Sequence, residues 1–232
     1  MQRSLTVITG AAGALGRAVA AVFRESGARL VLVDVDERAL DALYARDGGE
    51  SIRVAADLTD QAASGKALGK VFAEHGPATA LCNIAGGFDA GAPVHETTAQ
   101  TWQRMQDLNV ATLINACRAA VPGMIAAGGG KIVNVSAASA VSGKAGMGAY
   151  CAAKSAVARI TESMAAELRA SGINVNAVAP SIIDTPANRA AMPGADPAKW
   201  VSPKDLAAVI RFLASEDARA IHGAIIPVVG LS

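Results

Sequence analysis

The segment Thr6–Gly16, with the sequence TVITGAAGALG, decides the fold. It runs from a short β-branched stretch into three glycines, Gly10, Gly13 and Gly16, and then into a helical pattern. Glycine permits a tight turn and lets the backbone approach a pyrophosphate closely. The first turn of the following helix offers that anion unpaired N–H groups and the positive end of the helix dipole. The segment therefore predicts a dinucleotide-binding loop, although a plain Gly/Ala-rich turn has a similar composition.

Beyond this loop, short apolar runs alternate with helical patterns almost to the end of the 232-residue chain. Such alternation predicts parallel strand pairing, right-handed crossovers and helices on both faces of one sheet. We therefore expect an α/β fold with a single Rossmann-type, doubly wound parallel sheet of about seven strands, in one domain over 1–232. The expected strands are 5–9, 29–33, 51–55, 79–83, 131–135, 173–178 and 224–228, and the expected helices are 15–26, 37–46, 60–74, 99–127, 149–170 and 204–214.

Segment 181–202 departs from this alternation because it contains three prolines, a glycine and Trp200. A long connection late in an α/β sheet is usually a surface loop, but it can also cover a substrate. We expect it to be a substrate loop.

The composition excludes several classes of function. The 21 basic and 20 acidic residues nearly balance, and no basic block with interleaved aromatics indicates nucleic acid. The N-terminus lacks the pattern of a signal peptide, and the apolar runs look too short or too interrupted to span a bilayer. Cys82, Cys117 and Cys151 have neither disulfide nor zinc spacing. We therefore expect a cytoplasmic protein with buried cysteines, no metal, no nucleic-acid partner and no membrane partner.

Asp34 follows the apolar run 30–33 and lies 24 positions after Gly10. This spacing is close to that of the acid that binds the adenosine ribose in dinucleotide sites. A carboxylate at this place would repel the additional phosphate of NADP, and no basic residue follows at once. NAD (NADH) is therefore the preferred cofactor and NADP the less favoured one, unless Asp34 is simply a surface acid at a strand end.

Tyr150 and Lys154 are four residues apart in AYCAAK, so on a helix they share one face. A free tyrosine has a pKa of about 10. A nearby ammonium favours the phenolate, so we expect Lys154 to lower the pKa of Tyr150 toward neutrality. The pair alone is common by chance, and its information lies in its place after the other motifs.

In this order and spacing, the motifs resemble the short-chain dehydrogenase/reductase family over nearly the whole chain. The resemblance implies that Tyr150 is the catalytic proton donor or acceptor, assisted by Lys154, with Asn109 supporting a water-linked proton path to the lysine. It also implies dimers or tetramers in which the helix at 149–170 packs against its copy. The cofactor-binding positions that it implies are Gly10, Gly13, Leu15, Gly16, Asp34, Asp57, Leu58, Asn83, Ala85, Gly86, Tyr150, Lys154, Pro180, Ile183 and Thr185.

The chain departs from the family pattern at the catalytic serine. That serine normally lies 13 residues before the tyrosine, where this chain has Ala137. Ser136 and Ser139 are close by and are candidates for a substitute hydrogen bond to the substrate oxygen. Because side chains alternate along a strand, Ser136 would point away from the direction of residue 137 unless the backbone bends.

One branch of the family, the quinonoid dihydropteridine reductases, dispenses with that serine. Several segments resemble this branch, including Ala85–Phe88, Gly146–Met147 and Asp184–Arg189. The chain is therefore expected to be an NAD(H)-preferring oxidoreductase that moves hydride between nicotinamide and a carbonyl or alcohol of a small-molecule substrate. A reductase of quinonoid dihydropteridines is one alternative. An NAD(H)-binding sensor or interaction protein with little catalysis is another.

Overall fold

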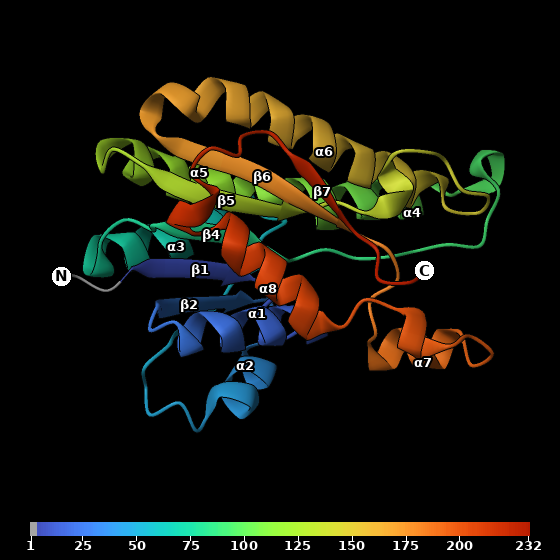
Figure 1. Cartoon of the computed structure of the whole chain (residues 1–232), viewed down its shortest axis with the longest axis horizontal. Coiled ribbons are helices and arrows are strands. Elements are labelled where there is room, and N and C mark those ends of the chain that lie inside the picture. The colour runs from blue at the N-terminus through green and yellow to red at the C-terminus, as the bar shows by residue number, and fades with distance from the viewer. Residues whose placement is uncertain (1–3) are drawn as a thin grey trace.

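The computed structural model describes residues 4–232, so residues 1–3 of the expected domain lie outside the described residues. The chain forms a seven-stranded sheet of order β3-β2-β1-β4-β5-β6-β7 in which every neighbouring pair is parallel (Figure 1). The expected doubly wound α/β sheet is confirmed. The strands are β1 Leu5–Thr9, β2 Arg29–Asp34, β3 Ile52–Ala55, β4 Ala80–Asn83, β5 Gly130–Val135, β6 Ile173–Pro180 and β7 Ile225–Val228.

Two apolar layers enclose the sheet because residues of each central strand alternate between its faces. In β2, Val31 and Val33 join one cluster, while Leu30 and Leu32 join the other. The first layer is covered by α3 Gln61–His75, α5 Thr112–Ala126 and α6 Gly148–Leu168. The second is covered by α1 Ala14–Glu25, α2 Glu37–Tyr44 and α8 Pro203–Leu213.

The helix expected at 99–127 is divided by a π-helical turn. The helix α4 covers Ala99–Gln106, the π-helical turn η2 covers Asp107–Ala111, and α5 follows. By length and composition alone the stretch Ala99–Ala126 could cross a membrane, as the core helices of many globular proteins could. Its α5 part nevertheless buries an apolar face in the sheet layer, as a core helix does.

Segment 181–202 is more ordered than a plain loop. It contains α7, Pro186–Ala191, and the short 3-10 turn Pro197–Lys199. The Thr185 hydroxyl accepts the Asn188 N–H at 3.2 Å and so caps α7. Because prolines are well suited to the first turn of a helix, the same residues that marked a loop in the sequence begin these two turns.

The remaining short elements are 3-10 turns that connect the longer ones. One of them precedes α4, and another follows β5. They are η1 Val94–Glu96, η3 Ala138–Ala140, η4 Arg169–Ser171 and η6 Glu216–Ala218.

Candidate active site

The strand order of the sheet reverses direction between β1 and β4, and we call the region at the carboxyl ends of these two strands the crevice. Such switch points are the usual ligand sites of open α/β sheets. The Thr9 hydroxyl oxygen accepts the N–H groups of Ile84 and Ala85 at 3.0 and 3.1 Å, which ties the two loops together. Gly10 has φ +64°, and a Cβ there would lie 2.9 Å from the Ala85 Cα. Only glycine fits this approach.

The glycine loop leaves the first turn of α1 open. Gly13 is the N-cap residue, and it supplies no side-chain hydrogen bond to the helix. A Cβ on Gly16 would collide with the Gly10 carbonyl oxygen, so the loop can close under the helix only with glycine at this position. The result is a 12-residue helix whose uncapped N-terminus can receive a pyrophosphate. Buried Leu15 anchors this turn in the core.

The Asp34 carboxylate lies beside the glycine loop. It accepts the Ala12 N–H at 2.9 Å and the Asp36 N–H at 3.2 Å. These contacts hold an acid at the end of β2, where the ribose was expected. Tyr44 was missed by the sequence interpretation: its buried hydroxyl donates to the Ala11 carbonyl at 2.7 Å, and burial raises its pKa to about 12.

Two further expected cofactor positions follow β3. Asp57 is exposed, and its carboxylate accepts the N–H and hydroxyl of Thr59 at 2.9 and 2.7 Å. The buried Leu58 offers its carbonyl to the Asn115 amide at 3.0 Å. Both expected positions therefore follow the carboxyl end of β3, which pairs with β2.

Asn83 ends β4 with a side chain that is only partly satisfied. Its amide nitrogen donates to the Asn134 side chain at 2.9 Å, while its Oδ1 is buried without a hydrogen-bond partner among residues 4–232. Beyond it the backbone passes close to α6. A Cβ on Gly86 would lie 2.8 Å from the Asn109 Oδ1 and 3.4 Å from the Lys154 Nζ. Because Gly86 has no side chain, it does not cover the Lys154 ammonium on the side of the crevice.

Asn109 holds the loop after β4 from within the π-helical turn. Its amide nitrogen donates to the carbonyls of Gly87 and Met105, each at 3.0 Å, and its Oδ1 accepts the Gly87 N–H at 3.2 Å. Turns of this kind interrupt helices most often at functional sites. The sequence identified Asn109 but gave no sign of the turn that presents it.

Tyr150 and Lys154 lie on the first two turns of α6, beside this loop. The Lys154 Nζ donates to the Val135 carbonyl at 2.9 Å and lies 5.9 Å from the centre of the Tyr150 ring. The Phe88 ring stands edge-on to Tyr150 with the centroids 4.9 Å apart. Within residues 4–232 the Tyr150 hydroxyl has no hydrogen-bond partner, so it is free to bond a substrate oxygen.

The expected lowering of the Tyr150 pKa is wrong. Burial, assisted by the neighbouring Cys151 thiol, raises the pKa of Tyr150 to about 12. Burial also lowers the pKa of Lys154 to about 8, which weakens the cation that was expected to favour the phenolate. Tyr150 therefore carries its proton at neutral pH and is a weaker acid than a free phenol.

Ser136 does not replace the serine that is absent at residue 137. Its hydroxyl is buried and donates to the Lys154 carbonyl at 2.9 Å, because alternation along β5 turns it toward α6. This contact argues against the proposed hydrogen bond from Ser136 to a substrate. Ser139 is half-buried in the 3-10 turn after β5, and Ala137 is buried in extended backbone.

The segment after β6 holds three of the expected cofactor positions, Pro180, Ile183 and Thr185. Pro180 ends the strand, and Ile183 forms a parallel bridge with Val201. The Ile183 carbonyl accepts the Asn188 amide at 2.8 Å, so α7 is fastened to the segment that precedes it. Thr185 uses its hydroxyl oxygen as the cap of α7 and retains its hydroxyl proton for another partner.

Comparison with known proteins agrees with this geometry. A family model described as short chain dehydrogenase matches residues 4–195. The chain belongs to the short-chain dehydrogenase family. It is an oxidoreductase of the type that uses a nicotinamide cofactor, and the open helix N-terminus with its close glycine contacts fits such a dinucleotide.

Two curated relatives and two solved structures match nearly the whole chain. A cis-4-hydroxycyclohexanecarboxylate dehydrogenase of Sinomonas cyclohexanicum is 38% identical, covering 97% of this chain and 95% of that protein. A meso-2,3-butanediol dehydrogenase of Serratia marcescens is 34% identical, covering 97% and 93%. A short-chain type dehydrogenase/reductase from Mycobacterium ulcerans has a TM-score of 0.91 at 28% identity, covering 100% and 90%. A gluconate 5-dehydrogenase from Burkholderia cenocepacia, in complex with NADP and tartrate, has a TM-score of 0.91 at 26% identity, covering 99% and 95%.

Proposed function

We propose that this protein is a cytoplasmic NAD(H)-preferring oxidoreductase that interconverts a secondary alcohol and a ketone. The observation that carries the proposal is the placement of Tyr150 and Lys154 at the carboxyl ends of β4 and β5, with Gly86 between the lysine and the crevice. The bound nicotinamide supplies or accepts the hydride. The side chains of this protein would transfer the proton and hold the cofactor.

In the proposed reaction Tyr150 transfers the proton. As a phenol it donates to the substrate oxygen during ketone reduction, and it takes the proton back during alcohol oxidation. Lys154 is held by the Val135 carbonyl within reach of the cofactor ribose, and Asn109 positions the loop and a water beside it. The segment at 180–185 binds the carboxamide end of the nicotinamide, with Pro180, Ile183 and Thr185 as its contacts.

A cyclic or bulky apolar substrate is favoured by the mouth of the crevice. Phe88, Val94 and Val141 are exposed by 59%, 62% and 85%. The loops that carry them meet where the Gly91 N–H donates to the Gly146 carbonyl at 2.8 Å, close to Tyr150 in sequence. A relative named for a hydroxycyclohexane carboxylate is consistent with this preference.

The test is NADH oxidation with alicyclic ketones, acyclic ketones and quinonoid dihydropterins. The proposal is contradicted if none of the ketones is reduced.

The preference for NAD rests on Asp34 and is tested by Asp34→Ala. The variant loses a carboxylate that would bond the ribose hydroxyls and repel the additional phosphate of NADP. We expect the ratio of kcat/KM for NADH over NADPH to fall by about 100-fold, the order of two lost charge effects. The measurement is steady-state kinetics with both cofactors on one ketone. Asp41→Ala, an exposed acid on the same strand–helix unit, is the control and should keep the wild-type ratio.

Ala137 keeps a quinonoid dihydropteridine reductase as a second candidate, because a protonated or conjugated C=N substrate depends less on a serine hydrogen bond. Ala137→Ser tests the choice. We expect kcat/KM for ketones to rise by about 100-fold, the order of one donor to a developing oxyanion. Quinonoid dihydropterin reduction should change little. If the pterin is the better substrate of the unchanged protein, the ketone proposal is replaced by this candidate.

The binding-only alternative is separated by the same assays. A sensor would bind NADH at micromolar concentration and turn over no substrate on the panel. For assembly we propose a homodimer or homotetramer in which α6 packs against its copy, as the family resemblance implies. Sedimentation equilibrium measures this, and a monomer at micromolar concentration would contradict it.

A further inference from the structure

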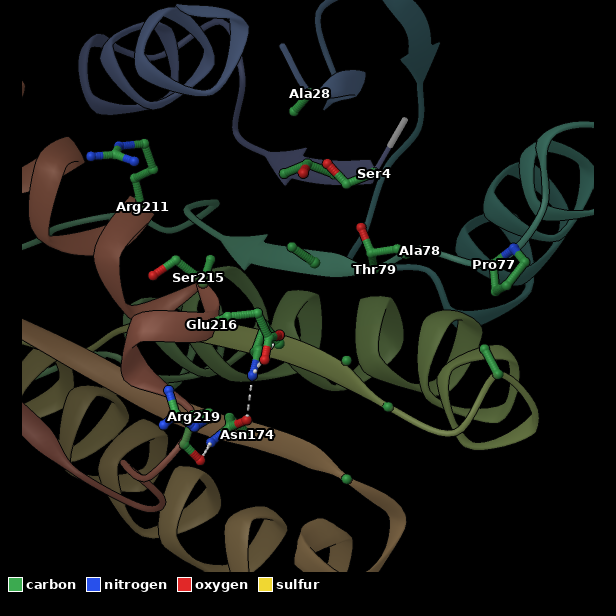
Figure 2. Close-up of a pocket in the computed structure, with 18 of the residues that line it drawn as sticks. Ser4, Ala28, Pro77, Ala78, Thr79, Asn174, Arg211, Ser215, Glu216 and Arg219 are labelled. Carbon is green, nitrogen blue, oxygen red and sulfur yellow. Dashed lines mark hydrogen bonds and ion pairs between the residues drawn. The ribbon is translucent and has the colours of Figure 1, made fainter. Parts of the chain in front are cut away.

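A cavity of about 760 Å3 opens at the amino ends of the central strands, the opposite end of the sheet from the catalytic crevice. This volume lies in the range of small-molecule sites. Figure 2 shows its two sides: Arg211, Ser215, Glu216 and Arg219 come from the α8–η6 segment, and Ser4, Pro77 and Thr79 come from the strand ends. The proposed oxidoreductase reaction uses none of these residues.

The charges that line this cavity are strongly unequal. Its positively charged residues are Lys131, Arg169, Arg211 and Arg219, and its one carboxylate is Glu216. With His222 counted as neutral, four cations against one anion leave a surplus of three positive charges, whereas the whole chain has a net charge of only +1. In the described part of the chain, Arg169, Arg211 and Arg219 have no carboxylate partner within 4.0 Å.

Lys131 is the buried cation of the cavity. Only 9% of the residue is exposed to solvent, and a buried charge needs a counter-charge. Its Nζ donates to the Asn174 Oδ1 at 2.8 Å and lies 3.2 Å from a Glu216 carboxylate oxygen. An ammonium has three N–H donors, so one remains without a partner in residues 4–232.

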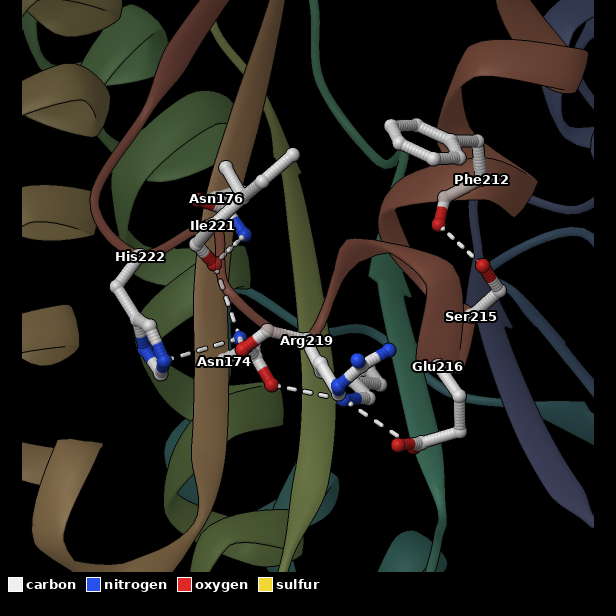
Figure 3. Close-up of polar contacts among 9 residues, drawn as sticks. Asn174, Asn176, Phe212, Ser215, Glu216, Arg219, Ile221 and His222 are labelled. Carbon is white, nitrogen blue, oxygen red and sulfur yellow. Dashed lines mark hydrogen bonds and ion pairs between the residues drawn. The ribbon is translucent and has the colours of Figure 1, made fainter.

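Asn174 is held so that it presents its oxygen to this lysine. Figure 3 shows the arrangement: the Asn174 amide nitrogen donates to the carbonyls of Arg219 and Ile221, each at 2.9 Å, and lies 3.2 Å from the His222 Nε2. Glu216, by contrast, has a side chain that is 82% exposed. A preorganised ammonium is therefore paired with a carboxylate that can swing into water when another anion arrives.

We propose that this cavity binds a small phosphate-bearing anion with two or three negative charges. Its phosphate oxygens replace Glu216 at Lys131 and bond the guanidinium groups of Arg211 and Arg219, whose planar donors match phosphate geometry. A single carboxylate would neither fill the cavity nor match its charge surplus. The site is distinct from the glycine loop, which lies at the other end of β1.

The test is isothermal titration of sodium pyrophosphate into the full-length protein, with and without saturating NADH, at constant ionic strength. We expect saturable one-to-one binding that NADH does not displace. Arg211→Gln should weaken it by about tenfold, the order of one charge-assisted hydrogen bond. Glu216→Gln should tighten it severalfold because a competing anion is removed.

Arg46→Gln removes a charge from an exposed residue outside the cavity and should leave the affinity unchanged. Arg211 and Glu216 are exposed, so their variants should fold, which circular dichroism confirms. The proposal is overturned if no saturable binding occurs, if NADH displaces the pyrophosphate, or if the Arg211 and Glu216 variants bind as the wild type does. Because the two variants locate the site, this result is independent of whether the oxidoreductase proposal holds.

Discussion

Tyr150→Phe is expected to reduce kcat by about 1000-fold while NADH affinity stays within about twofold. The variant loses only the hydroxyl, and removal of a general acid costs 10²- to 10⁴-fold as an order of magnitude. The phenyl ring can keep the edge-on contact with Phe88, whose centroid lies 4.9 Å away, so the helix should not shift. Stopped-flow measurement of NADH oxidation and fluorescence titration of NADH give the two quantities.

Tyr44→Phe is the matched control, since Tyr44 is the other of the two tyrosines in the chain. Its hydroxyl donates to the Ala11 carbonyl under the glycine loop and lies away from the proton transfer. Its loss should cost about 1 kcal/mol of folding free energy and weaken NADH binding, with kcat changed only a few-fold. If Tyr150→Phe retains full activity, the proton comes from another group and the proposed mechanism is wrong.

The raised pKa of Tyr150 could not be predicted from the sequence. The spacing of Tyr150 and Lys154 predicted one helix face correctly, because helical periodicity is a local property. It could not predict that Lys154 would be buried and Tyr150 half-buried, since this burial depends in part on Phe88, which lies on the distant loop after β4. Desolvation then raises one pKa and lowers the other.

The same division between local and distant information explains the fold. Strands and most helices followed from periodicity, and the glycine loop from its position after β1. The π-helical turn around Asn109 did not, because it results from contacts with the Gly87 backbone rather than from helix propensity. Tyr44 was invisible for a similar reason: its one distinguishing contact is with a carbonyl 33 residues away.

Gly16→Ala is expected to weaken NADH binding by at least about 100-fold and to destabilise the fold by about 1–3 kcal/mol, the usual cost of overpacking. The added Cβ would meet the Gly10 carbonyl oxygen and the Ala11 Cα, both of them backbone atoms that cannot rotate away. The glycine loop must therefore move outward, and its N–H groups no longer point at the pyrophosphate. Fluorescence titration of NADH and urea unfolding measure the two effects.

Gly69→Ala is the matched control, since Gly69 lies in α3, is exposed, and has nothing within 4 Å of an added Cβ. It should stabilise the fold by about 0.5–1 kcal/mol because alanine loses less entropy in a helix, with NADH affinity unchanged. The contrast separates the helical preference of alanine from the steric demand of the loop. Wild-type NADH affinity in Gly16→Ala would mean that the pyrophosphate does not sit at the N-terminus of α1, and the cofactor assignment at this loop would have to be abandoned.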